Sequence, residues 1–154
     1  RAVGTNRFTR MGAMTIELGP ADEKTSRRMR KVRRSGSEIE LRLRRELHRR
    51  GLRYRVNLHG LPGTPDVAFT RVKVAVFVDG CFWHRCLVHG TEPKSNGPWW
   101  KEKLDANVER DRRKDAELEV LGWLPVHIWE HDDPVEAASL IHRLWSERGA
   151  SALR

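Results

Sequence analysis

The segment from Val74 to His89, VAVFVDGCFWHRCLVH, concentrates the chemically reactive side chains of this 154-residue chain. A β-branched run ends in Asp-Gly, and both cysteines then fall in the same nine residues as two of the seven histidines. Asp66 stands eight residues before Val74, in the segment PGTPDVAF. Carboxylate, imidazole and thiol groups in this pattern predict a metal-dependent enzyme that cuts nucleic acid.

Oxygen ligands for a hard cation come from two places. Cleavage of a phosphodiester needs Mg²⁺ to polarise the phosphoryl group, and Mg²⁺ prefers oxygen ligands. Asp66 offers a carboxylate at the start of a predicted strand, and the backbone carbonyl of Val78 offers a second oxygen. His84 is a candidate general base, because imidazole titrates near neutrality. Taken alone, Asp66 is better explained as a turn carboxylate after proline, so the hypothesis depends on the combination.

A second group of side chains suits a softer metal. Cys81, Cys86 and His89, joined by the distant His131, would form a closed tetrahedral site for Zn²⁺. The alternative is a pair of free thiols with surface histidines. Two cysteines exclude a framework of several disulfides, and the neighbouring histidines favour metal over a single disulfide. Zinc would brace the long loop over residues 80–98, which has no hydrophobic core of its own.

Two aromatic pairs, Phe82-Trp83 and Trp99-Trp100, lie in or beside polar, basic loops. Apolar side chains of this kind can push between base steps and open a duplex. A core position is the ordinary explanation for any single tryptophan. Neighbours on a strand or helix point apart, however, so at least one member of each pair is available for a ligand.

Charge favours a polyanionic partner. The net charge is +9 and the sequence pI is about 10.4, with basic residues in large excess over residues 24–50. Each phosphate neutralised by Lys or Arg releases counterions and favours binding. With 38% hydrophobic and 33% charged residues, the chain has no apolar run near the roughly 18 residues that span a membrane. Residues 1–20 also lack the pattern of a signal peptide, so we expect a cytoplasmic protein.

Seven elements would position these groups, in the order α-β-β-β-α-β-α. Ser37 and Glu40 have the spacing of a capping box at the start of the first helix. The predicted ranges are a helix over 37–50, strands over 54–57, 67–69 and 73–78, a helix over 99–121, a strand over 123–130 and a helix over 134–148. The nearly continuous apolar strand 73–78 should be central, and Pro125 places 123–130 at an edge or a bulge. The fold class is therefore α/β, with a central mixed β-sheet flanked by helices.

One domain over residues 24–148 accounts for these elements, with a basic arm at 24–36. We expect residues 1–23 to form a disordered tail and 149–154 a C-terminal tail. On the helix over 99–121, the predicted inward positions are Trp100, Leu104, Val108 and Ala116. Asn107 and Asp111 share another face, for which a solvated row of salt bridges is the simpler explanation.

Five segments resemble successive blocks of one family. LPGTPDVAF, VFVDGCFWHRC, WWKEKLDANVERDRR, LGWLPVHIWEH and the basic start SRRMRKVRRSGSEIELRLRRELHRRGLRYR resemble the very short patch repair (Vsr) DNA mismatch endonucleases, from about Lys24 to Trp145. The resemblance implies a restriction-endonuclease-like core and a Mg²⁺-dependent nick beside a T:G mismatch in bacterial DNA. It also implies a structural zinc, aromatic side chains intercalated at the mismatch, and a monomer on double-stranded DNA.

The resemblance assigns roles to individual residues. Asp66 matches the essential Mg²⁺-binding aspartate, Val78 the metal-binding carbonyl, and His84 a catalytic histidine. Glu40 matches an acid of the first helix near the site, and Asp111 an acid that supports another active-site residue. The implied zinc ligands are Cys81, Cys86, His89 and His131. The implied intercalating residues are Phe82, Trp83 and Trp100, and the implied contacts to the DNA backbone are Arg27, Arg28, Arg30, Lys31 and Lys103.

Two departures from the family pattern leave alternatives open. Asp79 stands where a well-studied member has a catalytic histidine, so Asp79 either shares proton transfer with His84 or joins Asp66 on Mg²⁺. The zinc loop has a C-x4-C-x2-H pattern instead of a histidine-rich run, and His131 replaces a cysteine. Two rival functions remain: a nuclease of the same fold without a mismatch requirement, and a catalytically inactive, zinc-stabilised DNA-binding module.

Overall fold

The structure, a computed structural model, describes residues 36–90 and 97–151. The elements follow the predicted order, with bounds that differ by a few residues. They are α2 (Glu38–Arg49), β1 (Arg55–Val56), β2 (Val67–Phe69), β3 (Val74–Asp79), α3 (Gly97–Val120), β4 (Leu124–Trp129) and α4 (Pro134–Ser151). The predicted DNA-backbone residues Arg27, Arg28, Arg30 and Lys31 lie outside the described residues, as do the tail over 1–23 and residues 24–35 of the basic arm.

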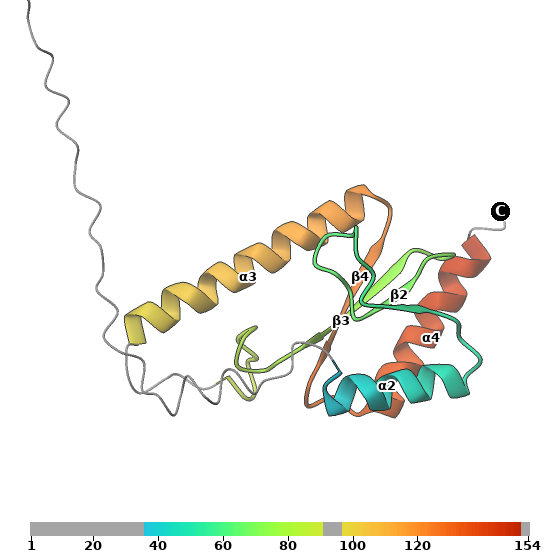
Figure 1. Ribbon diagram of the computed structural model, residues 1–154, viewed down its shortest axis with the longest axis horizontal. Helices are drawn as coiled ribbons and strands as arrows, with labels where there is room; N and C mark the ends of the chain where they lie inside the picture. The colour runs from blue at the N-terminus through green and yellow to red at the C-terminus, as the bar shows by residue number, and fades with distance from the viewer. Residues whose placement is uncertain (1–35, 91–96, 152–154) are drawn as a thin grey trace, which may run out of the picture. The chain divides into compact units, whose positions relative to one another are not determined.

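The four strands form one mixed sheet in the order β1-β2-β3-β4. β2 pairs antiparallel with both β1 and β3, whereas β3 and β4 pair in parallel. A parallel pair needs a crossover connection, and α3 supplies it (Figure 1). The mixed sheet and the central position of the strand predicted over 73–78 are confirmed, and of the two positions predicted for the strand with Pro125, an edge or a bulge, the structure has the edge.

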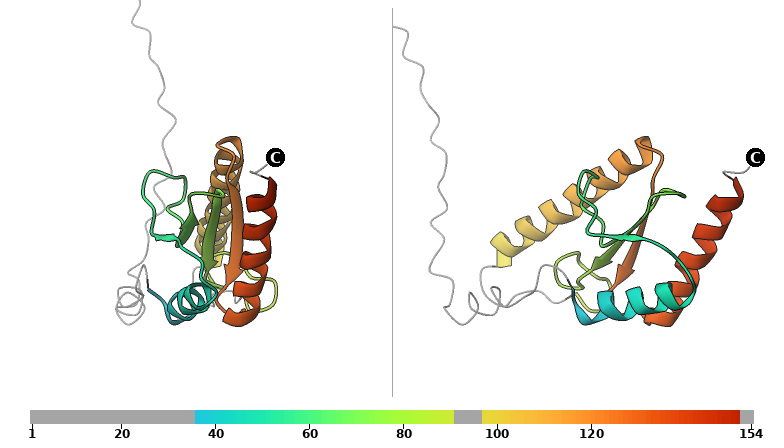
Figure 2. Two further views of the ribbon diagram at one scale, coloured as in Figure 1. Left: turned by 90° about the vertical axis from the view of Figure 1, so that its right-hand side faces the viewer. Right: turned by 45° about the vertical axis from the view of Figure 1, so that its right-hand side comes forward.

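Strand alternation divides the sheet into an apolar face and a polar face. Val74 and Val76 of β3 belong to the buried core with Leu43 and Leu47 of α2 and Ile141 of α4. Residues between them along the strands point to the opposite face, because successive strand side chains alternate. That second face carries Phe77, Asp79 and His127. Figures 1 and 2 show α4 on one side of the sheet and α3 on the other.

The start of α2 has the predicted capping box. The Oγ of Ser37 accepts the backbone N–H of Glu40 at 3.3 Å, and the Glu40 carboxylate accepts the Ser37 N–H at 3.3 Å. These two bonds satisfy backbone groups that would otherwise lack partners at a helix start. Leu43 and Leu47 then lie one turn apart, fully buried against the sheet.

α3 begins at Gly97, two residues before the predicted start, and one predicted inward position is wrong. Ala116 is exposed, and Leu118 is buried instead. The reason is that the stripe facing the protein runs through Leu104, Asp111 and Leu118 at seven-residue intervals, so an aspartate occupies an inward position. A search for apolar periodicity alone cannot find such a stripe.

Smaller differences appear at other element ends. Lys73 has a left-handed backbone with φ of 51° and belongs to the β2–β3 turn, so β3 starts one residue late. α4 continues to Ser151, three residues beyond the predicted helix end at residue 148. None of the helices over 36–90 and 97–151 is long and apolar enough to cross a membrane.

Candidate active site and metal centre

An open cavity of about 500 Å³ lies on the polar face of the sheet, beside α3. It is lined by five of the predicted site residues, which are Asp66, Val78, Asp79, His84 and Asp111. These residues come from the start of β2, the end of β3, the following loop and the middle of α3. The tertiary structure thus brings together residues that span 46 positions of the sequence, from 66 to 111.

A tight turn delivers Asp66 to this cavity. Gly63 has a φ of 81°, and a Cβ at this position would lie 2.9 Å from Cε1 of Phe77, so only glycine fits. Oδ2 of Asp66 accepts the backbone N–H of Val78 at 2.8 Å. The pKa of Asp66 is raised to about 6, mainly by burial and in part by the nearby Glu40 and Asp79, against the opposing effect of the Val78 bond and of Arg44.

Glu40 lies behind the site and does not line the cavity. The carboxylate is only 7% exposed, and both oxygens have partners. Oε1 accepts from Ser37, while Oε2 accepts the N–H of Gly36 at 2.8 Å and Arg44 at 3.1 Å. Arg44 also donates to the backbone carbonyl of Asp66 at 3.2 Å. Arg44 therefore connects Glu40 to the backbone of Asp66. Our sequence analysis missed Arg44, although it lies one helical turn beyond Glu40.

His84 is held by α3. Nδ1 of His84 lies 2.8 Å from Oδ2 of Asp111, so the carboxylate accepts an N–H from that nitrogen. The other nitrogen, Nε2, lies 3.8 Å from Oδ1 of Asp79. An imidazole that donates from Nδ1 keeps Nε2 available to accept a proton.

The site also contains His127, which our sequence analysis missed. Nδ1 of His127 lies 2.6 Å from Oδ2 of Asp79, and Nε2 lies 3.1 Å from both oxygens of Asp115. The hydrogen bond to Asp79 is the main cause that raises the pKa of His127 to about 9, with burial opposing it. One signal was present: in WLPVHIW, the histidine alternates with Val126 and Ile128 and must face away from the core.

Two cations on α3 complete the cavity wall. Arg110 and Lys114 both line it, and Nζ of Lys114 lies 3.7 Å from Oδ1 of Asp111. The stem of Lys114 runs over the turn at Gly63, since a Cβ on that glycine would meet Cδ of Lys114 at 3.3 Å. The cavity therefore presents carboxylates from both walls, from the sheet side and from Asp111 and Asp115 of α3, and its ammonium and guanidinium groups lie on the helix side.

The three predicted intercalating residues form one aromatic cluster. The ring of Phe82 lies 5.1 Å from that of Trp83 and 5.3 Å from that of Trp100, both edge to face. Trp99 continues the cluster at 4.8 Å from Trp100, and Nζ of Lys103 lies 5.3 Å from the centre of the Trp99 ring. All four rings are partly exposed, so none belongs to the buried core.

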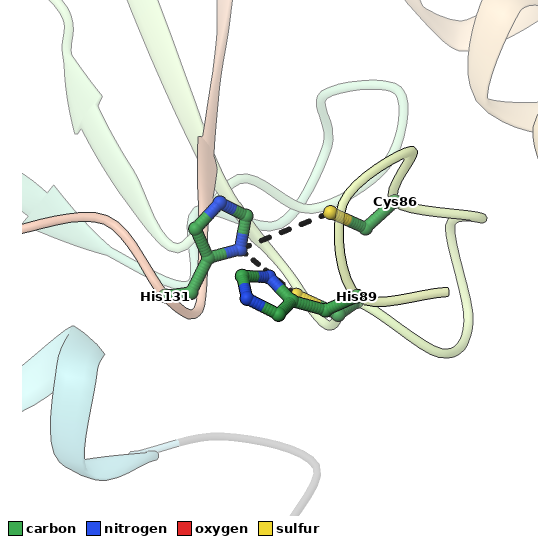
Figure 3. Close-up of side chains that lie close together, drawn as sticks. Cys86, His89 and His131 are labelled. Carbon is green, nitrogen blue, oxygen red and sulfur yellow. Dashed lines mark hydrogen bonds between the residues drawn. The ribbon is translucent and has the colours of Figure 1, made fainter. Parts of the chain in front are cut away.

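The second predicted group, Cys81, Cys86, His89 and His131, also converges. One potential ligand atom from each of the four residues lies within 4.8 Å of the others (Figure 3). Nδ1 of His131 lies 3.0 Å from Sγ of Cys81 and 3.9 Å from Sγ of Cys86. The pairing of Asp79 with Trp129 in the parallel β3–β4 ladder places the residues two positions beyond each strand end side by side.

The two thiols of this group differ in acidity. Burial, together with the neighbouring Cys86, raises the pKa of Cys81 to about 12. Both cysteines are free and buried. Desolvation would raise the pKa of the Cys86 thiol, but the backbone N–H groups of His89 and Val88 outweigh it and lower that pKa. The backbone N–H of Cys81 is bonded to Oε1 of Glu130 at 2.8 Å, which ties the loop to the end of β4. Two sulfurs and two imidazoles at these distances could hold one metal ion.

Comparison with known proteins agrees with this geometry. The family model described as "DNA mismatch endonuclease Vsr" matches residues 20–89. The chain is 42% identical over 127 residues to the type II nicking enzyme V.NaeI of Lentzea aerocolonigenes. The aligned residues cover 79% of this chain and 76% of that protein. It is also 38% identical over 107 residues to the DNA mismatch endonuclease Vsr of Escherichia coli, and this alignment covers 68% of this chain and 68% of that protein. The chain belongs to the Vsr family.

A third relative is matched over the largest share of its own length among the three. The type II nicking enzyme V.XorIIP of Xanthomonas oryzae pv. oryzae is 40% identical over 119 residues, or 76% of this chain and 85% of that protein. Membership in the Vsr family makes this protein an endonuclease. The family match over 20–89 includes Asp66 and His84, whereas Asp111, His127 and His131 lie beyond it and join the site through the fold.

Proposed function

We propose that the protein is a Mg²⁺-dependent DNA endonuclease that nicks one strand of a duplex at or beside a T:G mismatch. One observation carries the proposal: a carboxylate at a strand start and a histidine oriented by a second carboxylate line the same cavity, Asp66 on one side and His84 with Asp111 on the other. The printed names of the relatives, nicking enzymes and a mismatch endonuclease, agree with it. A DNA substrate would place the protein in the bacterial cytoplasm.

Asp66 and the carbonyl of Val78 would hold the Mg²⁺ ion. The N–H and C=O of a residue in an extended strand point to the same side, and the Val78 N–H already reaches Asp66. The raised pKa of Asp66 fits a cation, because a bound ion would relieve the repulsion by Glu40 and Asp79. When bound, Mg²⁺ polarises the scissile phosphoryl group and stabilises the departing oxygen.

His84 accepts the proton of the attacking water. Asp111 holds Nδ1–H and so leaves the Nε2 lone pair facing the cavity. The water oxygen attacks phosphorus, the bond to the leaving oxygen breaks, and the proton moves to Nε2 of His84. Arg110 and Lys114, from the same helix, are placed to contact the phosphate oxygens.

Phe82, Trp83 and Trp100 would enter the duplex next to the mismatch. Their rings form one edge-to-face cluster on the loop after β3 and at the start of α3, where they remain partly exposed. Inserted rings recover by stacking part of the few kcal/mol that opening a base step costs. A mismatched step is easier to open, so the cluster would favour T:G over a matched pair.

Zinc would occupy the group formed by Cys81, Cys86, His89 and His131. Thiolate and imidazole ligands favour Zn²⁺ over Mg²⁺, so Zn²⁺ would bind at this group and Mg²⁺ at the oxygen ligands of Asp66 and Val78. A site that joins the loop after β3 to the end of β4 would fix the loop that carries Phe82 and Trp83.

A nicking assay tests the proposal. A duplex with one T:G mismatch and the matched T:A duplex are incubated with the zinc-loaded protein, with and without Mg²⁺. We expect one strand of the T:G duplex to be cut only when Mg²⁺ is present, and no cutting by Asp66→Asn. Glu117→Gln is the matched control, because it removes one negative charge from the exposed side of α3.

The rival functions give different outcomes in the same assay. Equal cutting of the two duplexes would identify a nuclease without a mismatch requirement. DNA binding without cutting at any metal concentration would identify an inactive DNA-binding module. Cutting by Asp66→Asn at the wild-type rate would remove the proposed metal site.

A further inference from the structure

His127 is held in a fixed orientation at the edge of the cavity. Its ring stacks on Phe77 with centroids 5.2 Å apart and an angle of 18°, because the parallel register pairs Phe77 with His127. Nδ1 reaches Asp79 at 2.6 Å, and Nε2 reaches Asp115 at 3.1 Å. A ring with a stacking partner and two bonded nitrogens differs from an ordinary surface histidine, although its side chain is 31% exposed.

Two carboxylates on α3 each form a hydrogen bond with one imidazole of the site. Asp111 and Asp115 lie four positions apart on one helical face, so they project toward the sheet together. Asp111 holds His84, and Asp115 holds His127. Asp79 lies between the two imidazoles, so a continuous row of alternating carboxylates and imidazoles crosses the cavity.

The hydrogen bond from His127 decides what Asp79 can do. Oδ2 of Asp79 is occupied by His127, and only Oδ1 remains to face His84, with 3.8 Å between Oδ1 and Nε2. That separation is too long for a direct hydrogen bond, but one water molecule beside both atoms could contact each of them. The Asp79 carboxylate is 7% exposed, so it cannot turn freely to another partner.

We propose that His127 is a positioning residue for strand cleavage: by holding Oδ2 of Asp79, it directs Oδ1 toward the water that His84 activates. This inference rests on the proposed nicking activity. It assigns Asp79 to orientation of the water, because its free oxygen Oδ1 is the one that faces Nε2 of His84. Asp115 acts one step further back, since it fixes the ring of His127.

Two substitutions of His127 distinguish the effect of its hydrogen bonds from the effect of its side-chain volume. His127→Leu keeps most of the volume and removes both hydrogen bonds, whereas His127→Asn retains an N–H donor near the position of Nδ1. His142→Leu is the matched control, because His142 lies on α4 and stacks on Trp145. The readouts are the single-turnover nicking rate on the T:G duplex with saturating enzyme and the Kd for the same DNA.

We expect His127→Leu to lower the nicking rate about 10- to 100-fold at an unchanged Kd, since small misplacements of catalytic groups have effects of this size. His127→Asn should recover most of the rate, and His142→Leu should match wild type. A wild-type rate for His127→Leu per folded molecule, or no recovery with asparagine, would overturn the proposal. If His127→Leu does not fold, Asp115→Asn loosens the same ring from outside, and a wild-type rate for that variant would overturn it too.

A second readout needs no cleavage. Imidazole ¹H–¹⁵N spectra of the DNA-free protein report the hydrogen bonding of each ring nitrogen. His127→Leu should shift the ring signals of His84 because it frees Asp79, and Asp115→Asn should do so because it loosens the ring that holds Asp79, whereas His142→Leu should not shift them. Unchanged His84 signals would overturn the positioning role. If the signals shift but wild type cuts no duplex, the proposed nicking function is the part that fails.

Discussion

Asp66→Asn should stabilise the Mg²⁺-free protein while it abolishes nicking. The pKa of Asp66 is raised from 3.8 to about 6, first by burial and then by Glu40 and Asp79. A shift of this size corresponds to at most about 3 kcal/mol of unfavourable free energy for the ionised folded state, at roughly 1.4 kcal/mol per pKa unit. Because Asp66 borders an open cavity, solvent screening reduces this to about 1–2 kcal/mol. Asparagine removes the charge, and its carbonyl oxygen can still accept the Val78 N–H.

Thermal unfolding of the zinc-loaded protein in Mg²⁺-free buffer at pH 7.5 measures the effect. A gain of about 1–2 kcal/mol should raise Tm by roughly 2–8 °C in a chain of this size. The difference should shrink as the pH falls through 6 toward 4, because wild-type Asp66 then binds a proton more readily in the folded than in the unfolded state. Added Mg²⁺ should raise the Tm of wild type but not of Asp66→Asn, since a ligand stabilises only a protein that binds it.

The control is again Glu117→Gln, whose exposed position predicts little change in Tm at any pH. An Asp66→Asn protein that melts at or below the wild-type temperature at pH 7.5 would show that the carboxylate is not destabilised by its surroundings. A Tm difference that persists unchanged down to pH 4 would show that charge is not the cause. Either result would refute the electrostatic argument for a cation at Asp66.

Four further outcomes test other parts of the site. His84→Ala should lower the single-turnover nicking rate about 100-fold or more with little change in DNA affinity; a mild effect beside a severe Asp79→Ala would reverse the two roles. Trp83→Ala should reduce the ratio of T:G to T:A nicking in a folded protein, whereas loss of folding at constant selectivity would place Trp83 in the core. Metal analysis should find about one zinc per chain, lost in Cys81→Ser, and a zinc-free wild type that is folded and active would contradict the site. The raised pKa of His127, from 6.5 to about 9, means that its stabilising effect is complete below pH 6.5 and is lost as the pH rises through 9. Unfolding free energy should therefore fall more between pH 6.5 and 9 in wild type than in His127→Asn, and parallel pH profiles would exclude an ionised His127 at neutral pH.

Local features of the structure could be predicted from the sequence. The capping box of Ser37 and Glu40 fixes a helix start through bonds only three residues apart. The nearly continuous apolar, β-branched run predicted β3 as a central strand, and the proline predicted β4 at an edge or a bulge. The metal preference of Cys81 and His131 could also be predicted from the sequence, because residue type alone determines which metals a side chain prefers.

The geometry of the site depended on pairings that only the tertiary structure decides. Cys81 meets His131 because β3 and β4 run in parallel; an antiparallel pairing would have placed them at opposite ends of the sheet. His127 reaches Asp79 through the same register, across 48 residues of sequence. The inward aspartates of α3 broke the apolar periodicity that identifies a buried helix face. The positions of side chains that face a polar cavity are fixed by hydrogen bonds to residues distant in the sequence. Local sequence patterns therefore do not predict which residues those partners are.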